Sequence, residues 1–210
     1  MAATKRENIE IKKAEPKHAS LAAELIFETD SHVFGYWFGG NKERALNYFA
    51  LQWRGTEGPF SHIFGQGAFD GEDLVGIEAG YDRERQHREG RTFFRHAEEL
   101  LTPSEYDEFK KAIGYMPFLN PPIPRDAYYL QTLAVSKKRQ REGIGELLII
   151  SAFERAAAQG FRSCHLDVYA DNPAVDFYLR MGMEIFCEMR VPCLEKHHHI
   201  ARHYRMVKGF

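Results

Sequence analysis

The sequence predicts a mixed α/β domain in which helices flank a central β-sheet and further helices are inserted between two of its strands. Segments with the alternating apolar pattern of strands follow segments whose apolar residues recur at helical spacing. The length of 210 residues suits one domain with a substantial core. From about residue 84 to residue 125 the pattern changes to dense charge and then to prolines, which indicates the inserted helices. We therefore expect a single domain over residues 1–210.

The first half of the chain predicts three strands and two helices. Apolar residues recur on one helical face over residues 17–29, and residues 41–54 show a similar pattern. The turn Asp70-Gly71-Glu72-Asp73 separates two strand-like segments and predicts a hairpin. The aromatic residues at 34 and 36–38 suit both a core and the wall of a pocket. The expected strands cover residues 9–13, 61–69 and 74–81.

The second half predicts four strands and two helices. The β-rich, apolar segment 128–135 is typical of a central strand. The segment 143–159 has apolar residues at helical spacing and ends at Gly160, which suits a C-terminal cap. Asn172-Pro173 opens a short helix that stops at Gly182. The remaining strands are expected over residues 163–169, 183–191 and 201–207.

The composition is that of an ordinary globular protein, with 44% hydrophobic and 28% charged residues. A formal net charge of −2 gives no overall attraction to nucleic acid or to an anionic membrane. No apolar run approaches the roughly 18 residues that span a bilayer, and the N-terminus lacks the apolar stretch of a signal peptide. We therefore expect a cytoplasmic protein that has neither nucleic acid nor a membrane as its partner.

The cysteines and histidines predict no metal site. Cys164, Cys187 and Cys193 show no CxxC spacing, which is typical of reduced thiols. The consecutive histidines at positions 197–199 would point to alternating faces of a strand and so do not converge on one ion. We expect this histidine run to form a polar turn between strands.

The most informative segment directly follows the strand predicted at 128–135 and opens the helix predicted at 143–159. Glycines at such a place let a ligand come close to the backbone. The first amides of a helix lack intrahelical acceptors and lie at the positive end of its dipole, so they favour a pyrophosphate. A plain strand-to-helix turn is the alternative interpretation. The loop consists of Gln140, Arg141, Glu142, Gly143, Ile144 and Gly145.

Two other phosphate-binding patterns fit this loop poorly. The Walker pattern ends in Gly-Lys-Ser/Thr, whereas Gly145 is followed by Glu146 and Leu147. The dinucleotide pattern needs a third spaced glycine, which this loop lacks.

With these features the sequence resembles the GNAT family of N-acetyltransferases. The resemblance covers residues 128–189, which would be the cofactor-binding core. It implies a mixed, mostly antiparallel central sheet flanked by helices, with the helical insertion between strands 3 and 4. The motifs that carry it are Leu133-Ala134-Val135, Gln140-x-x-Gly143-x-Gly145, Asn172 and Tyr178-x-x-x-Gly182, in this order.

The resemblance implies acetyl-coenzyme A as co-substrate and gives each motif a role. The strand 133–135 would pair through its backbone with the pantetheine arm, and amides across 140–145 would hold the pyrophosphate. The strand 163–169 would splay away from its neighbour and open a slot for the arm, which Asn172 would contact. Tyr178 would protonate the departing thiolate, because a tyrosine hydroxyl can donate a proton and regain it from solvent. The alternative for Tyr178 is a core aromatic residue.

The sequence departs from the family pattern at the cofactor contact. Asn172 lies one residue closer to Tyr178 than is usual, so Asp171 is the alternative contact.

A second departure concerns the general base. Many family members carry a glutamate on the strand before the glycine loop, where this sequence has Tyr129. Asp167, which shares a strand face with His165, and Glu78 on the earlier hairpin are the two carboxylates that remain as bases. A chain of water molecules is the third route, since the amine need only be neutral when it attacks.

These observations predict an N-acetyltransferase that acts on a primary amine of a small molecule or protein, by direct attack in a ternary complex. A covalent relay through Cys164 is disfavoured, because that thiol lies in an apolar strand. The alternative is a non-catalytic acyl-coenzyme A binder that acts as a sensor. The resemblance also implies pairing of two copies through their C-terminal strands.

Overall fold

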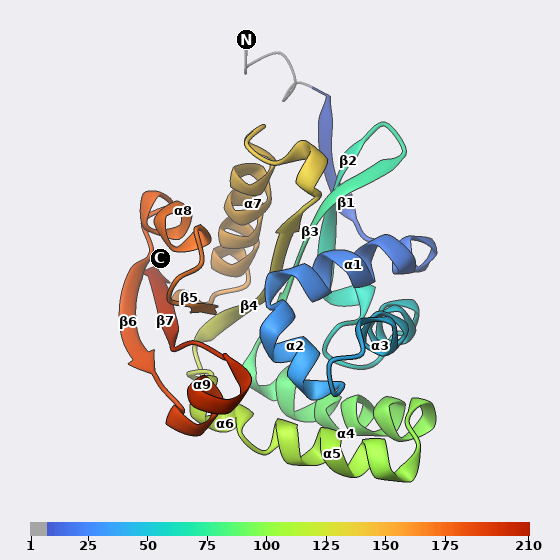
Figure 1. Cartoon of the computed structure of the whole chain (residues 1–210). Helices are drawn as coiled ribbons and strands as arrows, with labels where there is room; N and C mark the ends of the chain where they lie inside the picture. The colour runs from blue at the N-terminus through green and yellow to red at the C-terminus, as the bar shows by residue number, and fades with distance from the viewer. Residues whose placement is uncertain (1–7) are drawn as a thin grey trace.

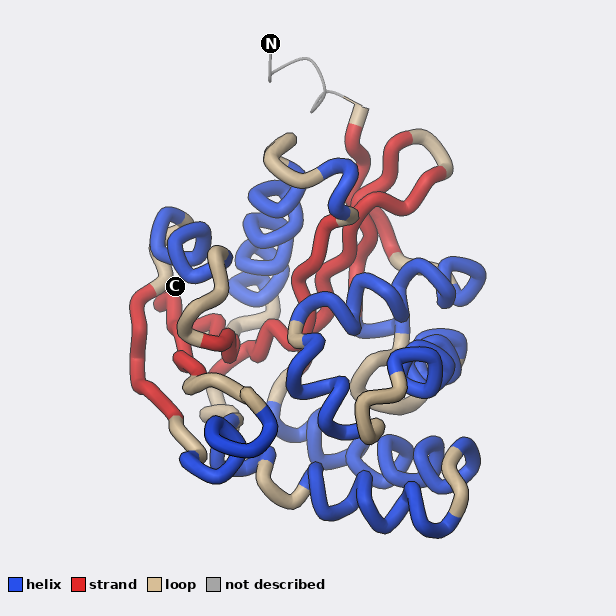
Figure 2. The backbone as a smooth tube through the Cα atoms, viewed as in Figure 1, coloured by secondary structure: helices blue, strands red, loops and turns tan. Residues whose placement is uncertain are grey.

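The structure is a computed structural model that describes residues 8–210, and it is built around one seven-stranded sheet (Figures 1 and 2). The strand order is β1-β2-β3-β4-β5-β7-β6. Every neighbouring pair is antiparallel except β4 and β5, which run parallel. This confirms the predicted mixed, mostly antiparallel sheet. The strands are β1 (Ile9–Lys13), β2 (Gly65–Asp70), β3 (Asp73–Tyr81), β4 (Ala127–Val135), β5 (Ser163–Tyr169), β6 (Glu184–Met189) and β7 (His203–Gly209).

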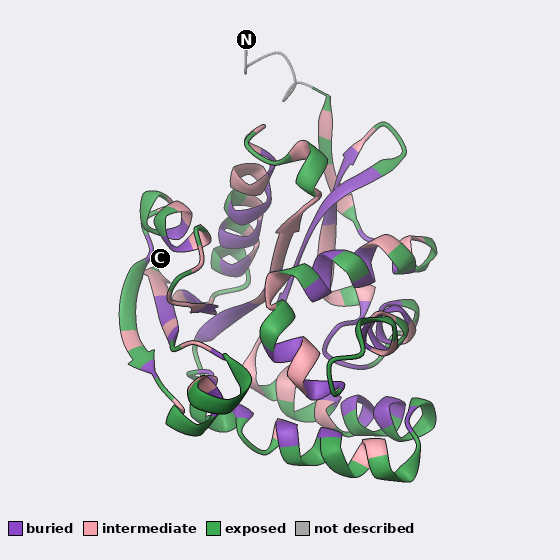
Figure 3. Ribbon diagram, in the orientation of Figure 1, coloured by how far each residue is buried: buried purple, intermediate pink, exposed green. Residues whose placement is uncertain are grey.

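Helices flank the sheet, and three of them lie between β3 and β4 in the chain, as predicted. In one cluster of buried side chains, the five helices from α1 through α5 pack with strands β2 and β3. In a second cluster, α7 and α8 pack with β4, β5 and β7. Figure 3 shows buried and exposed stretches alternating along α1 and α7, as expected for helices with one buried side. The helices are α1 (Ala19–Thr29), α2 (Ser31–Trp37), α3 (Lys42–Arg54), α4 (Arg83–Leu100), α5 (Pro103–Ile113), α6 (Met116–Leu119), α7 (Ile144–Ala158), α8 (Ala174–Arg180) and α9 (Pro192–His198).

Local side-chain caps fix where several helices begin. The Asn41 side chain accepts a hydrogen bond from the Arg44 amide at 3.0 Å and caps α3. Asp82 accepts from the Arg85 amide at 2.7 Å and caps α4. A capping box between Thr102 and Glu105 begins α5.

Three local expectations differ from the structure. The strand predicted from residue 61 begins only at Gly65, because Ser61 caps a turn of 3₁₀ helix at His62–Phe64. No helix was expected over residues 31–37, yet α2 forms there because Asp30 accepts a hydrogen bond from the Val33 amide at 3.1 Å.

The third difference is the histidine run, which is not a turn between strands. His197 and His198 end α9, whose first residue is a proline, and His199 follows in the left-handed region at φ 55°. Within residues 8–210, no group of three or more His, Cys, Asp and Glu side chains is arranged to hold a metal ion. In the same part of the chain, no helix is both long and apolar enough to cross a bilayer.

The sheet splays between β4 and β5. The two strands pair only at Ala127–Tyr129 and Ser163–His165, and β5 then stays paired with β7 along its whole length. The stretch of β4 from Leu130 to Val135 therefore has no partner strand on its β5 side. An unpaired strand edge offers backbone donors and acceptors to an extended ligand.

Candidate active site

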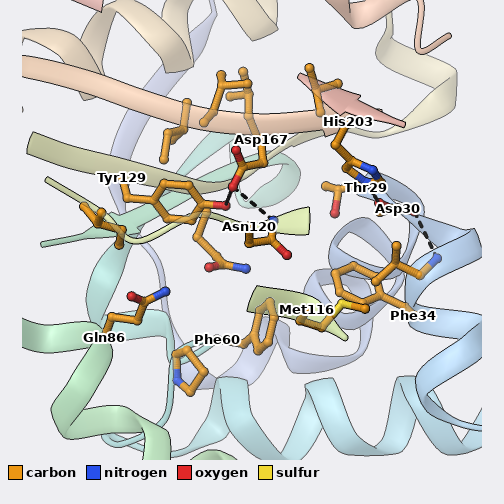
Figure 4. A pocket seen from close by; sticks show the side chains of 18 of the residues that line it. Thr29, Asp30, Phe34, Phe60, Gln86, Met116, Asn120, Tyr129, Asp167 and His203 are labelled. Carbon is orange, nitrogen blue, oxygen red and sulfur yellow. Dashed lines mark hydrogen bonds and ion pairs between the residues drawn. The ribbon is translucent and has the colours of Figure 1, made fainter. Parts of the chain in front are cut away.

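A cavity of about 800 Å³ lies at the splayed end of β4 and β5. Its opposite walls come from α1 and α2, the first half of α4, and the segment 113–123 around α6. Figure 4 shows side chains from these elements converging on one space. The cavity brings together seven of the residues that the sequence analysis selected: Leu133, Ala134, Val135, Gln140, Asp167, Asn172 and Tyr178.

The glycine loop lies beside this cavity. Gln140 lines the cavity and donates a hydrogen bond from its side chain to the Val135 carbonyl at 3.1 Å. Gly143 has φ +81°, a conformation that favours glycine, and it precedes the first residue of α7. Gly145 lies in the first turn of α7, where amides have no intrahelical acceptor. Of the predicted loop residues, 141–145 do not line the cavity itself.

The basic residues of this loop have different partners. Arg139 donates to Glu142 at 2.8 Å and to Asp70 at 2.7 Å, so its charge is neutralised within the protein. Lys137 forms an ion pair with Glu28 at 2.8 Å. Sequence patterns do not reveal the pairs with Glu28 and Asp70, because these two residues are distant in the chain from Lys137 and Arg139.

Asn172 caps a helix and also lines the cavity, while the cofactor contact expected of it stays a prediction. Its side-chain oxygen accepts a hydrogen bond from the Ala174 amide at 2.8 Å, which caps the start of α8. The same residue lines the cavity, as does Ala174. The capping bond holds the Asn172 side chain at the wall of the slot between β4 and β5.

Tyr178 lies on α8 and lines the cavity while its ring packs in the core. Burial raises its pKa above the ordinary value, so the hydroxyl keeps its proton at neutral pH. Within the described part of the chain, no residue forms a hydrogen bond with this hydroxyl. A protonated hydroxyl without a protein partner is able to donate to a bound molecule.

Asp167 is held by three side chains. Arg205 forms two hydrogen bonds with its carboxylate, one from Nε to Oδ1 and one from Nη2 to Oδ2 at 2.7 Å. The Tyr129 hydroxyl and the Asn120 amide each donate to Oδ2 at 3.0 Å. Figure 4 shows Tyr129 and Asn120 pointing towards the carboxylate. The Asp167 side chain is only 2% exposed, so this geometry favours a role in positioning its neighbours.

Glu78 lies away from the cavity. Its side chain is fully buried and forms an ion pair with Arg155 on α7, which donates from Nη2 to Oε2 at 2.8 Å. Arg155 also donates to the Tyr128 hydroxyl at 2.8 Å. Burial raises the pKa of Glu78, and the Arg155 ion pair only partly offsets that rise. The base roles suggested for Asp167 and Glu78 stay predictions, and neither environment favours them.

Cys164 is fully buried in the core cluster under α7. Burial raises the pKa of its thiol to about 12, so the thiolate needed for a covalent relay is scarce at neutral pH. This agrees with the structural role expected for Cys164.

A buried ion pair that the sequence does not predict lies at the cavity wall. The Nε2 atom of His203, on β7, lies 2.9 Å from the Asp30 carboxylate. Its Nδ1 atom lies 3.0 Å from the Ala201 carbonyl oxygen. Both partners are acceptors, so the imidazole donates from both nitrogens and carries a positive charge. Burial alone would lower the pKa of His203, but the Asp30 carboxylate more than offsets this and raises it. Asp30 and His203 are 173 residues apart, so no local pattern indicates the pair.

The raised pKa of His203 predicts a pH-dependent stability. A histidine whose pKa is higher in the folded state stabilises the fold fully below its unfolded pKa of roughly 6.5. That contribution is lost as the pH rises through the folded pKa. We expect the stability difference between wild type and His203→Gln to narrow as the pH rises above roughly 6.5, as measured by urea unfolding at each pH.

Asp30→Asn is the matched control for this prediction. An asparagine keeps a capping oxygen for α2 but removes the charge that favours the imidazolium. Its stability difference from wild type is therefore expected to show the same narrowing. A difference that is constant with pH for both variants would contradict the ion pair.

Aromatic side chains form the part of the cavity opposite the sheet. Phe34 and Trp37 on α2 belong to the core cluster and also line the cavity, which agrees with the mixed role expected for this segment. Phe34 contacts Trp37 edge to face, with ring centroids 4.9 Å apart. Phe60 and Phe93 continue the same wall.

The comparison with family models identifies one family. The model of the acetyltransferase (GNAT) family matches residues 36–183. A search among curated proteins finds no significant match. Among solved structures, the fold is similar to that of an N-acetyltransferase from Staphylococcus aureus Mu50, with 15% identity, a TM-score of 0.73, and coverage of 95% of this chain and 100% of that chain.

Two further solved structures show the same fold. An acetyltransferase of the GNAT family from Streptococcus pneumoniae has 22% identity and a TM-score of 0.53, with coverage of 96% of this chain and 99% of that chain. The PaiA N-acetyltransferase from Thermoplasma acidophilum, in complex with coenzyme A, has 15% identity and a TM-score of 0.52, with the same two coverages.

Proposed function

The chain belongs to the acetyltransferase (GNAT) family, and on that premise we propose that it moves the acetyl group of acetyl-coenzyme A to a primary amine. The acceptor is a small molecule or a protein, and it attacks directly in a ternary complex. The Tyr178 hydroxyl is the observation that carries this proposal. It lines the cavity beside the unpaired edge of β4, keeps its proton, and has no partner among the described residues.

The proposed cofactor site uses the splay of the sheet. The pantetheine arm would lie along Leu133–Val135, where β4 lacks a partner on its β5 side. The pyrophosphate would accept hydrogen bonds from amides in the first turn of α7, including that of Gly145. The complex of coenzyme A with the Thermoplasma acidophilum enzyme supports this class of co-substrate for a protein of this fold.

The proposed reaction forms a bond between nitrogen and the acetyl carbon and breaks the bond between that carbon and sulfur. A backbone amide near Leu133 would stabilise the oxyanion that develops in between. Tyr178 would donate its proton to the departing thiolate and regain one from solvent.

The amine proton would leave through water. The carboxylates that line the cavity are Glu28, Asp30 and Asp167, and each is paired with a cation of the protein. A cation beside a carboxylate favours its ionised form and so makes it a weaker base. This arrangement also supports the alternative of an acyl-coenzyme A binder without acceptor chemistry, but such a protein has no need of the Tyr178 hydroxyl.

Gly145→Ala tests the cofactor site. A Cβ at this position would lie 3.7 Å from Phe177 and 3.8 Å from Val135, which are ordinary contacts, so the fold has room for it. Alanine in place of a helical glycine is expected to stabilise the fold, by up to about 1 kcal/mol. The methyl group would hinder the approach of a pyrophosphate, so we expect the Kd of coenzyme A in calorimetry to rise about tenfold or more.

Gly35→Ala is the matched control for Gly145→Ala. Gly35 is also a helical glycine, has open space around it and does not line the cavity. It should show a similar gain in stability with an unchanged Kd for coenzyme A. Unchanged coenzyme A binding in Gly145→Ala would place the pyrophosphate elsewhere, and no binding to the wild-type protein would overturn the proposed function.

Oligomeric state and cellular location stay predictions. β6 is the last strand of the sheet, and its Ile185 and Phe186 side chains are exposed. An exposed apolar edge strand is a common pairing surface, which supports the homodimer that we expect.

A further inference from the structure

The cavity has an uncompensated positive charge on the α4 side. Arg83, the first residue of α4, lines the cavity, and within residues 8–210 no carboxylate lies within ion-pairing distance of it. The three carboxylates of the cavity wall are each neutralised by a lysine, a histidine or an arginine. An arginine next to a low-dielectric cavity favours an anionic group that can accept two hydrogen bonds from its guanidinium.

Gln86 supplies a second polar group beside Arg83. It lies one helical turn further along α4, so both side chains lie on the same helix face, and both line the cavity. Among the described residues, none forms a hydrogen bond with the side-chain amide of Gln86, whereas its backbone amide donates to the Asp82 carbonyl at 3.0 Å. Figure 4 shows Gln86 on the side of the cavity away from the Asp30–His203 pair.

The wall between this polar end and the sheet is apolar. Phe34, Phe60, Phe93, Met116 and Ile123 line it. Burial of apolar surface against such a wall favours a ligand with an apolar or aromatic body. A polyamine fits poorly, because it would place an ammonium group beside the like charge of Arg83 and remove others from water without a carboxylate partner.

The acidic residues of the inserted helices do not change this balance. Glu98, Glu99 and Glu105 do not line the cavity, and Glu105 forms an ion pair with Arg44. They therefore give the cavity no negative charge to attract a polycation.

We propose that the acceptor is a small primary amine with an aromatic or apolar body and a carboxylate at the end away from the amine, held by Arg83 and Gln86. This inference rests on the proposed acetyl transfer and narrows its acceptor. The reacting acetyl group would lie near Leu133, which pairs with Glu78 on β3. Tyr81 is three residues further along β3, a distance of about 10 Å at 3.3 Å per residue. Arg83 lies beyond that point, so the carboxylate and the amine lie at opposite ends of the acceptor.

Two amines with the same body provide the test. In 4-(2-aminoethyl)benzoate the amine and a carboxylate lie at opposite ends of a phenyl ring, and 2-phenylethylamine lacks only the carboxylate. Coenzyme A release would be measured with each amine, and with spermidine, at fixed acetyl-coenzyme A. We expect kcat/KM to be at least about tenfold higher with the carboxylate, as a charge-assisted pair with arginine should contribute that much.

Arg83→Gln should lower kcat/KM for 4-(2-aminoethyl)benzoate by about tenfold or more, chiefly by raising its KM. It should leave 2-phenylethylamine nearly unchanged. Arg88→Gln is the matched control, since Arg88 is exposed on the same helix and does not line the cavity. Calorimetry with coenzyme A should give the same Kd for both variants and wild type.

Other outcomes would overturn the inference in distinguishable ways. Equal use of the two aromatic amines, a preference for spermidine, or an equal loss for both amines in Arg83→Gln would refute the carboxylate pocket and leave acetyl transfer standing. Transfer to none of the three amines, with coenzyme A still bound, would refute the carboxylate pocket and count against the proposed function as well.

Discussion

Replacement of Tyr178 by phenylalanine is expected to lower kcat for acetyl transfer by about 100-fold or more, the usual range for the loss of a general acid. The ring would keep its place, because its packing in the core does not involve the hydroxyl. No described residue forms a hydrogen bond with that hydroxyl, so stability should change little. The measurements are steady-state release of coenzyme A and thermal unfolding of the same preparations.

Tyr115→Phe is the control for this substitution. Tyr115 is exposed and does not line the cavity, so its hydroxyl should not affect the reaction. The Kd of coenzyme A should be the same in both variants, since the proposed role of Tyr178 begins only when the bond to sulfur breaks. A Tyr178→Phe enzyme with wild-type kcat would assign the proton to water and remove the main support for the proposed mechanism.

Arg205→Met is expected to destabilise the protein by about 3–5 kcal/mol, as is typical when one partner of a buried ion pair is removed. The side chains of Asp167 and Arg205 are 2% and 3% exposed. The substitution leaves a buried carboxylate with only Tyr129 and Asn120 as donors. It also removes the hydrogen bond from Arg205 to the Pro121 carbonyl at 2.7 Å, which ties β7 to the segment before β4. Urea unfolding monitored by circular dichroism measures the loss.

A second variant separates a positioning role for Asp167 from a role as base. Asp167→Leu combined with Arg205→Met removes both charges and should recover much of the lost stability, because neither unpaired charge remains buried. Asp167→Asn alone should lower stability and activity together, since Arg205 is left unpaired. If Asp167→Asn were as stable as wild type and only kcat fell, the base role would be supported and the positioning role would be wrong.

Much of the fold could be predicted from local patterns. Apolar spacing located α1, α3 and α7 and most strands to within a few residues, because one face of each element must be buried. The helix expected over residues 41–54 begins where the Asn41 side chain accepts from the Arg44 amide, a bond that spans only three residues. The errors at residues 61–64 and 31–37 also have local causes, namely capping by Ser61 and Asp30.

The candidate site was predicted only in part. Tyr178, Asn172 and the strand 133–135 were selected from their order and spacing, and all of them line the cavity. The charged partners were missed: Arg205 lies opposite Asp167 in the register of β5 and β7, and His203 reaches Asp30 across the fold. Such pairs depend on strand register and helix packing, which bring together residues that are distant in the chain.

The sequence alone determined the α/β class, the inserted helices and the family resemblance, because each follows from periodicity, caps or glycine spacing within a short segment. Only the tertiary structure decided which carboxylates are neutralised, that Glu78 lies outside the cavity, and that Arg83 has no ion-pair partner among the described residues. The physical reason is that charge compensation and burial depend on distances through space. These distances are fixed only in the folded protein, where β5 separates from β4, pairs with β7, and the helices pack around the gap.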